Sequence, residues 1–304
     1  MGTSYWWIFD LFLIVIVIYV IVANAKRGVT KILLISIGYV FTTVAASLLA
    51  AIAAPTLYQT VAYDNNINGI VTANQHMDFV EVFSDAIDAQ QYGFVMDRAV
   101  VKRTLTDPKN NLHFHDVFFD YATQTTGGPV SMKSDFNQML YKAFAESYGA
   151  QLDERLPRYV RMYFDKQIRE NPEIMFSLIS VYYDNTKTQT ERADVLEKMF
   201  AAKPTTEVLQ IFIYLIIFSI IMAIIALISA ILQNRIFLNI QKVTDHAVGG
   251  LLGIIEAGIV VVLLTLVVRL LVLLVGGKFL FFNDATIAES KLFSFFYDHI
   301  GIML

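Results

Sequence analysis

Four long apolar stretches, with one long polar segment between the second and the third, dominate the pattern of this chain. The apolar stretches cover residues 5–23, 32–54, 208–232 and 248–275. Each is close to the ~20 residues that a helix needs to cross about 30 Å of hydrocarbon. The pattern therefore predicts an all-α integral membrane protein with four transmembrane helices.

The polar segment, residues 58–206, has a helical pattern of its own. Its apolar residues recur at helical spacing in three runs: Phe79, Phe83 and Ile87; Phe136, Met139, Leu140 and Phe144; and Leu152, Leu156, Val160, Tyr163 and Phe164. Helix breaks are expected where proline and glycine interrupt it: at Asp107-Pro108, Gly127-Gly128-Pro129, Asn171-Pro172 and Pro204. A segment of about 150 residues can bury its own core, so we expect an inserted α-helical domain.

The C-terminal residues 279–304 are too few and too charged for a fifth span. Their aromatic side chains, such as Phe293 and Phe296, are typical of a helix that lies along a membrane surface. The predicted division of the chain is therefore transmembrane helices 1 and 2 in 1–57, the inserted domain in 58–206, transmembrane helices 3 and 4 in 207–278, and an interfacial C-terminal helix in 279–304.

Composition supports the membrane assignment and excludes several classes of function. Of the 304 residues 16% are charged and 56% are hydrophobic, with a mean hydropathy of +0.54, whereas soluble domains carry about 25% charged residues. A net charge of −4 provides no basic footprint for nucleic acid, and a chain without cysteine has no disulfides and no thiolate metal site. Since the sequence contains no phosphate-binding loop, nucleophile elbow or zinc-protease helix, we expect a non-enzymatic protein without a cofactor.

The short loops between the apolar stretches indicate the orientation. Basic residues outnumber acidic ones in both: Lys26, Arg27 and Lys31 lie in the first, and Arg235 and Lys242 stand against Asp245 in the last. Because cytoplasmic loops carry the excess of Lys and Arg, we expect both termini and residues 58–206 outside a bacterial inner membrane. The Ala-Asn-Ala sequence at 23–25 has the form of a signal-peptidase site, but no basic residue precedes it, so we expect an uncleaved anchor.

Short motifs in the membrane part resemble the colicin V production protein (CvpA) family. They comprise an acidic residue inside the first span, a basic residue with glycine in the first short loop, the entry to the last span, and a serine in the closing segment: Asp10, Arg27, Gly28, Asp245, Gly249, Gly253 and Ser290. The chain departs from this pattern at Glu256 and Ala257, where the family often has a basic residue and a glycine, and in its long insert. The resemblance implies a bacterial inner-membrane protein that supports the production of colicin V or a similar peptide toxin.

Small residues recur at helical spacing in three of the apolar stretches. They are Gly38, Thr42, Ala46, Ala50 and Ala54 in the second, Ser219, Ala223, Ala226 and Ala230 in the third, and Gly249, Gly253 and Ala257 in the fourth. Helices in lipid have no hydrophobic drive to associate, and small residues let their backbones approach closely. We expect these stripes to pack the four helices of one chain together, with a homo-oligomer as the alternative.

Three ionisable residues lie within the apolar stretches: Asp10, Glu256 and Arg269. Charges there are costly and suggest function by default. Glu256 follows Gly249 by two turns and should face the packed interior, bonded to a Ser or Thr or, alternatively, lining a proton or ion path. Asp10 and Arg269 lie at similar depths below the same surface, so we expect an ion pair. In the alternative, Arg269 extends to the lipid headgroups while Asp10 bonds to a hydroxyl or a backbone amide.

In the insert, two groups of polar residues merit attention. Arg155, Arg158, Lys166 and Arg169 would share one helix face, which we expect to be an ordinary solvated surface. His113, His115 and Asp116 could supply metal ligands, but no second cluster accompanies them, so we expect no metal.

The sequence thus predicts a non-enzymatic membrane protein that contacts the lipid bilayer and supports toxin export or acts as an envelope scaffold for an unidentified partner. The alternative is an oligomeric channel or transporter for ions or small solutes, with a path through the second and fourth spans.

Overall fold

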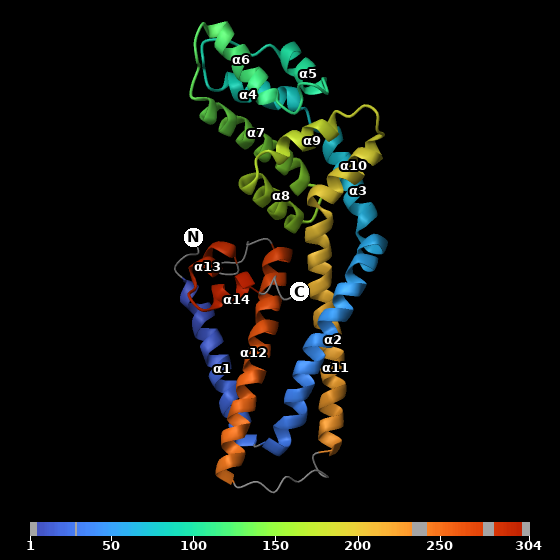
Figure 1. Ribbon diagram of the computed structural model, residues 1–304, viewed down its shortest axis with the longest axis vertical. Helices are drawn as coiled ribbons and strands as arrows, with labels where there is room; N and C mark the ends of the chain where they lie inside the picture. The colour runs from blue at the N-terminus through green and yellow to red at the C-terminus, as the bar shows by residue number, and fades with distance from the viewer. Residues whose placement is uncertain (1–4, 28, 233–241, 276–282, 300–304) are drawn as a thin grey trace. The chain divides into compact units, whose positions relative to one another are not determined.

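The computed structural model describes residues 5–27, 29–232, 242–275 and 283–299 (Figure 1). Within these residues every regular element is an α-helix. Gly28 and Arg235 lie outside the described residues, as do the side chains of Arg27, Lys31, Lys242 and Asp245. The chain divides into two compact units: a membrane unit of Met1–Leu57 and Thr206–Leu304, and an inserted unit of Tyr58–Thr205.

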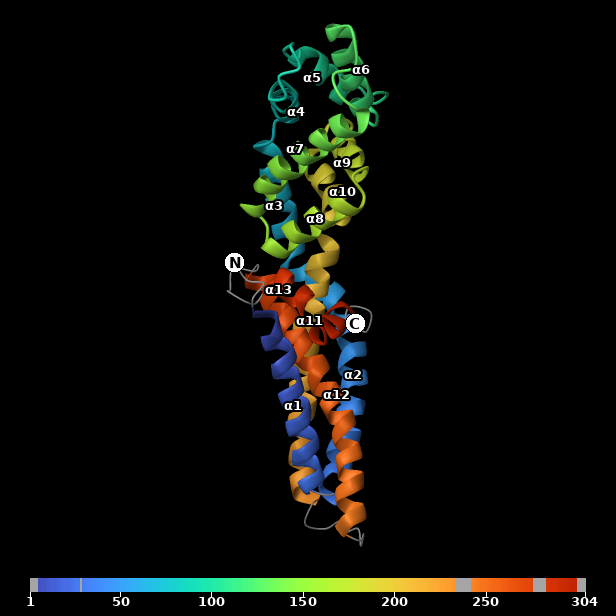
Figure 2. The ribbon, with the colours of Figure 1, turned by 90° about the vertical axis from the view of Figure 1, so that its left-hand side faces the viewer.

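Four helices of the membrane unit are long and apolar enough to cross a bilayer, which confirms the predicted architecture. Helix α1 lies against α12, and α2 lies against α11 (Figures 1 and 2). Leu266 of α12 joins the two pairs, because it is buried with Ala46 of α2 and Tyr214 of α11. The bounds of the four helices are Trp6–Arg27 for α1, Val29–Val61 for α2, Ala202–Leu232 for α11 and Lys242–Val275 for α12.

Helix α2 differs from the predicted second span at its C-terminal end. The sequence predicts an end at Pro55, but the helix continues through the proline to Val61. A proline inside a helix removes one backbone hydrogen bond and strains the preceding turn. Here the residues on both sides remain helical, so the proline interrupts the hydrogen-bond ladder without ending the helix.

The inserted unit consists of short helices around an aromatic core. Phe79, Phe83, Phe114, Phe144 and Phe164 are almost completely buried, and their rings meet in pairs, for example Phe83–Phe114 at 4.9 Å between centroids. The helices are α3 (Tyr63–Gln75), α4 (Phe79–Asp88), α5 (Arg98–Thr106), α6 (Phe114–Thr126), α7 (Lys133–Asp153), α8 (Arg158–Glu170), α9 (Ile174–Tyr182) and α10 (Gln189–Phe200).

Three of the four predicted helix breaks coincide with helix ends, whereas Pro204 lies in the first turn of α11. Several further breaks were missed, among them the one between α7 and α8. Helix α6 ends before Gly127, whose φ of 76° is in the left-handed region that glycine adopts readily. The apolar run from Leu152 to Phe164 suggests one helix, yet α7 ends at Asp153 and α8 begins after Pro157. Leu156 in the turn between them is also buried, so apolar spacing alone could not reveal the break.

The C-terminal segment forms two short helices rather than the single interfacial helix predicted. They are α13 (Asp284–Glu289) and α14 (Phe293–His299). Asn283 caps α13 by accepting a hydrogen bond from the backbone N–H of Thr286 at 2.8 Å. Ser290 stands in the sharp turn between the two helices, and its contacts belong to the site described next.

Candidate functional site at the junction of the first and last spans

The close approach of α1 and α12 depends on glycine. A Cβ added to Gly253 would lie 3.0 Å from the Cβ of Asn24 and 3.1 Å from the Cα of Ile21, so a larger residue requires the two helices to shift by a few tenths of an ångström. Two turns earlier in α12, His246 Nδ1 lies 2.6 Å from the carbonyl oxygen of Ala25. The two helices therefore make contact through backbone atoms and short side chains, as is usual in lipid.

Glu256 is buried in this contact, with 8% of its surface exposed. Asn24 Nδ2 donates a hydrogen bond to Glu256 Oε2 at 2.6 Å. The inward direction of Glu256 follows the prediction, but its partner is an asparagine from α1 rather than the Ser or Thr expected. An amide donor satisfies a buried carboxylate that would otherwise be costly at this depth.

At the other end of α1, Asp10 binds the start of α14. Its Oδ2 accepts a hydrogen bond from the backbone N–H of Lys291 at 2.9 Å, and its Oδ1 accepts from those of Leu292 and Phe293, both at 3.0 Å. The first N–H groups of a helix have no partner within the helix, and the helix dipole favours a negative charge there. Asp10 thus caps a helix that lies 281 residues or more away in sequence.

Ser290 completes the same arrangement. Its Oγ accepts a hydrogen bond from the N–H of Ser294 at 2.9 Å and donates one to the carbonyl oxygen of Ile287 at 2.6 Å. The backbone N–H groups of the four consecutive residues 291–294 therefore all have a side-chain acceptor, three from Asp10 and one from Ser290. Two motif residues from opposite ends of the chain converge on one turn.

The predicted ion pair between Asp10 and Arg269 is not formed: among the described residues, no ion pair joins them, and the Asp10 carboxylate is engaged by the three amides instead. This is the alternative that the sequence left open. Arg269 instead influences Tyr297 of α14. Burial and Asp284 raise the pKa of the Tyr297 hydroxyl, and the guanidinium of Arg269 partly offsets this rise. The similar depths of Asp10 and Arg269 did not decide the partner of Asp10, because the N-terminus of α14 offers its carboxylate several N–H donors at once.

Apolar and aromatic contacts surround the capped turn. The rings of Phe9 and Phe293 stack with centroids 5.1 Å apart, and Lys291 Nζ lies 5.9 Å from the centroid of the Trp6 ring. An apolar groove of about 270 Å³ lies where α1, α12 and α14 meet, lined by Ile8, Phe9, Phe12, Leu264, Val267, Val268, Leu271 and Phe293. The capped turn thus lies against the N-terminal end of α1 and the C-terminal part of α12.

Residues 176–301 match the model of a family described as Colicin V production protein. The matched range contains α12, with Gly249 and Gly253, and the capped turn at Ser290. Over these residues the chain is a member of the colicin V production protein (CvpA) family. The match does not reach Asp10, Arg27 or Gly28, and no curated protein or solved structure matches the chain.

The small-residue stripes of this CvpA-family protein have different environments. In α2 the stripe is buried inside the chain: Thr42, Ala46, Ala50 and Ala54 have no exposed surface, and a Cβ on Gly38 would lie 2.6 Å from Ile225. In α12, Gly249 and Ala257 are buried together with Gly253.

In α11, by contrast, the stripe does not pack inside the chain. Ser219, Ala223, Ala226 and Ala230 are all exposed. The buried face of α11 carries Ile211, Tyr214 and Phe218 instead, because large side chains fit against the alanines of α2. The spacing of the small residues identified one face of α11, but it could not tell whether that face or a neighbouring one packs against the other helices.

The two candidate groups in the inserted unit have the following environments. His115 Nε2 lies 3.1 Å from Asp116, and its ring stacks on Phe176; the described residues contain no group of three side chains that could hold a metal ion. Arg155 stands in the turn before α8, where it donates to the carbonyl oxygen of Gln151 and to Glu154. It therefore does not share one helix face with the three basic residues that follow: Arg158, Lys166 and Arg169.

Proposed function

We propose that this CvpA-family protein is a non-enzymatic scaffold of the bacterial inner membrane that supports the production or export of a peptide toxin. The observation that carries the proposal is the use of both intramembrane carboxylates to hold helices together. Asp10 anchors α14 through three amides, and Glu256 joins α12 to α1 through Asn24. A carboxylate that carries protons or ions must exchange partners or meet water, whereas these two have fixed partners within the protein.

The orientation is part of this proposal: both termini and residues 58–206 lie outside, and the short loops lie in the cytoplasm. It is supported by the basic residues of the first loop. Because the chain has no cysteine, single cysteines can be introduced and labelled in intact cells with an impermeant thiol reagent. We expect labelling of Ser134→Cys and no labelling of Thr30→Cys until the membrane is permeabilised. The reverse pattern would place the inserted unit in the cytoplasm.

The functional test is complementation of a colicin V-producing strain that lacks its own member of the family. We expect the wild-type chain to restore toxin activity in the medium and Asp10→Asn to restore much less, since the amide replaces one acceptor by a donor. Asp298→Asn, at an exposed residue of α14, is the matched control and should restore activity fully. Failure of the wild-type chain to restore toxin activity would overturn the proposed function. Full restoration by Asp10→Asn would show that the function does not depend on the Asp10 carboxylate.

The second candidate is an oligomeric channel, favoured by the exposed small-residue stripe of α11 as a contact between copies. Ion or proton flux into proteoliposomes distinguishes the two. The scaffold predicts flux no greater than that of protein-free liposomes. Flux that is present in the wild type and lost in Glu256→Gln would instead support the channel and overturn our first choice.

A further inference from the structure

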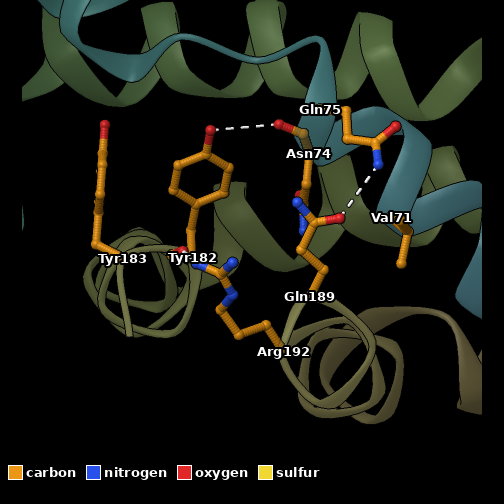
Figure 3. A pocket seen from close by; sticks show the side chains of 7 residues that line it. All are labelled: Val71, Asn74, Gln75, Tyr182, Tyr183, Gln189 and Arg192. Carbon is orange, nitrogen blue, oxygen red and sulfur yellow. Dashed lines mark hydrogen bonds between the residues drawn. The ribbon is translucent and has the colours of Figure 1, made fainter. Parts of the chain in front are cut away.

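The inserted unit contains a pocket where α3, α9 and α10 meet (Figure 3). Its volume is about 240 Å³, slightly below the ~300–1,000 Å³ of common small-molecule sites. It is lined by Val71, Asn74, Gln75, Tyr182, Tyr183, Gln189 and Arg192. Polar side chains thus predominate in a pocket with room for a group about the size of an amino-acid residue.

Arg192 gives the pocket its positive charge. Its Nη1 donates a hydrogen bond to the carbonyl oxygen of Tyr182 at 2.6 Å, which fixes the guanidinium against α9. Within the described part of the chain Arg192 has no ion-pair partner. Because a guanidinium carries five N–H donors, most of its donors remain for a ligand.

Two amide side chains of the pocket are oriented by their neighbours. The hydroxyl of Tyr148 donates to Asn74 Oδ1 at 2.9 Å. Gln75 Nε2 donates to Gln189 Oε1 at 3.2 Å (Figure 3). Both amide oxygens are therefore engaged, and the NH₂ groups of Asn74 and Gln189 are left as donors. The pocket consequently offers more donors than acceptors.

The acidic residues around the pocket have other partners, and none of those described forms an ion pair with Arg192. Asp78 accepts the N–H groups of Val80 and Glu81 at the start of α4. Glu191 bonds to Thr188 in the capping box of α10. Asp194 is held by the hydroxyl of Tyr63 and by Lys198.

We propose that this pocket binds a carboxylate, either the free C-terminus of a peptide or a small organic acid. The carboxylate meets Arg192 and the NH₂ group of Gln189, and the group that bears it rests against Val71 and the ring of Tyr183. Guanidinium and amide donors suit a carboxylate in both charge and geometry. This site is independent of the scaffold role proposed above.

The test uses N-acetylglycine as the probe and the full chain in detergent, with binding measured by calorimetry. We expect saturable binding with a dissociation constant on the order of 1 mM, as befits so small a ligand. N-acetylglycinamide, which has the same shape without the charge, should bind at least about tenfold more weakly. Equal binding of the two compounds, or no saturable binding of either, would overturn the proposal.

Variants assign the binding to this pocket. Arg192→Gln should weaken binding about tenfold or more, and Gln189→Ala, at an exposed residue, should weaken it severalfold without affecting folding. Arg169→Gln removes an exposed arginine at the end of α8 and should bind as the wild type does. Unchanged binding in both pocket variants would place the ligand elsewhere and overturn the proposal.

A longer probe distinguishes the two sources of the carboxylate. N-acetyl-pentaglycine should bind more tightly than N-acetylglycine when the natural ligand is a peptide C-terminus, because further residues add contacts beyond the pocket. Equal affinity identifies a small organic acid as the ligand.

Discussion

The two units of this protein use opposite means to bring helices together. In the inserted unit large aromatic rings are buried, and the exposed large apolar residues are few among those described: Val61, Val95, Leu112 and Met132. In the membrane unit large apolar residues point outward, for example Ile52 at 73% and Tyr19 at 71% exposed. Between its helices it buries small and polar residues, such as Ala46, Asn24 and Glu256, beside a few large ones such as Tyr214 and Leu266.

The difference follows from the solvent of each unit. In water the burial of a large apolar side chain is the main source of stability, so the inserted unit hides its phenylalanines. In lipid that gain is absent, and close backbone approach with satisfied polar groups holds the helices together. Burial of a large apolar side chain therefore stabilises the inserted unit strongly, whereas in the membrane unit it brings no such gain.

The largest expected effect is the removal of a buried ring from the inserted unit. Phe144 has no exposed surface and stacks on Phe79 at 5.4 Å, so Phe144→Ala should lower the unfolding free energy of this unit by about 3–5 kcal/mol. Phe212→Ala in α11 removes a ring that is 51% exposed and should change stability by less than about 0.5 kcal/mol. Hydrogen exchange of the full chain in detergent resolves both units. Equal losses would contradict the comparison.

The second effect concerns a carboxyl group buried in the inserted unit. Glu197 is 1% exposed, its Oε1 has no hydrogen-bond partner, and burial raises its pKa to about 7 from the ordinary value of 4.5. The folded state therefore holds a proton that the unfolded state releases, and stability falls as the pH rises from about 4.5 to about 7. The loss amounts to about 3 kcal/mol.

Replacement of Glu197 tests this pH dependence. Glu197→Gln cannot ionise and should remove that part of the pH dependence, measured by urea unfolding at pH 4.5–7.5. Asp184, whose pKa Lys187 and Thr186 lower to about 2, titrates below this window and does not interfere. Glu146→Gln, at an exposed residue, is the control and should retain the wild-type profile. A Glu197→Gln profile parallel to that of the wild type would show that the buried group does not titrate here.

The third effect belongs to the membrane unit and depends on a single methyl group. Gly253→Ala places a Cβ about 3 Å from the backbone of α1 and should lower stability by about 1–2 kcal/mol. At Gly258 of the same helix a Cβ meets nothing within 4 Å, so Gly258→Ala should be neutral or stabilise by up to about 1 kcal/mol. Trp6 and Trp7, the chain's 2 tryptophans, stand at the start of α1 and report its melting. A stability change of the same sign in both variants would refute close packing of the two helices through Gly253.

The sequence predicted the features that depend on local pattern. Span lengths and proline or glycine breaks are local, so the four spans and the end of α6 at Gly127 were predictable. The partners of Asp10 and Glu256 were not, because each depends on which residues distant in sequence meet it in space. The pocket at Arg192 has no motif, since the residues that line it come from three separate helices. Contacts between residues of different helices depend on how each helix is rotated about its own axis, which local sequence pattern does not specify.

The smallest expected effect compares two ways of starting a helix. Thr188 caps α10 with its own neighbours: its Oγ1 accepts the N–H of Glu191 at 3.2 Å, and Glu191 Oε2 accepts the N–H of Thr188 at 2.7 Å. Thr188→Ala should therefore cost about 1 kcal/mol in the inserted unit. Thr125→Ala, which removes only an exposed hydroxyl bonded to the carbonyl oxygen of Tyr121, should cost less than about 0.5 kcal/mol.

In the membrane unit the corresponding cap comes from another helix. Asp10→Asn should speed hydrogen exchange over residues 291–294 without altering α10, because this cap joins α14 to α1 rather than stabilising a helix alone. Thr188→Ala should do the converse, with exchange faster in the first turn of α10 and unchanged in α14. Faster exchange in both places for either variant would mean that the two caps are not separate, and the distinction between local and long-range capping would fail.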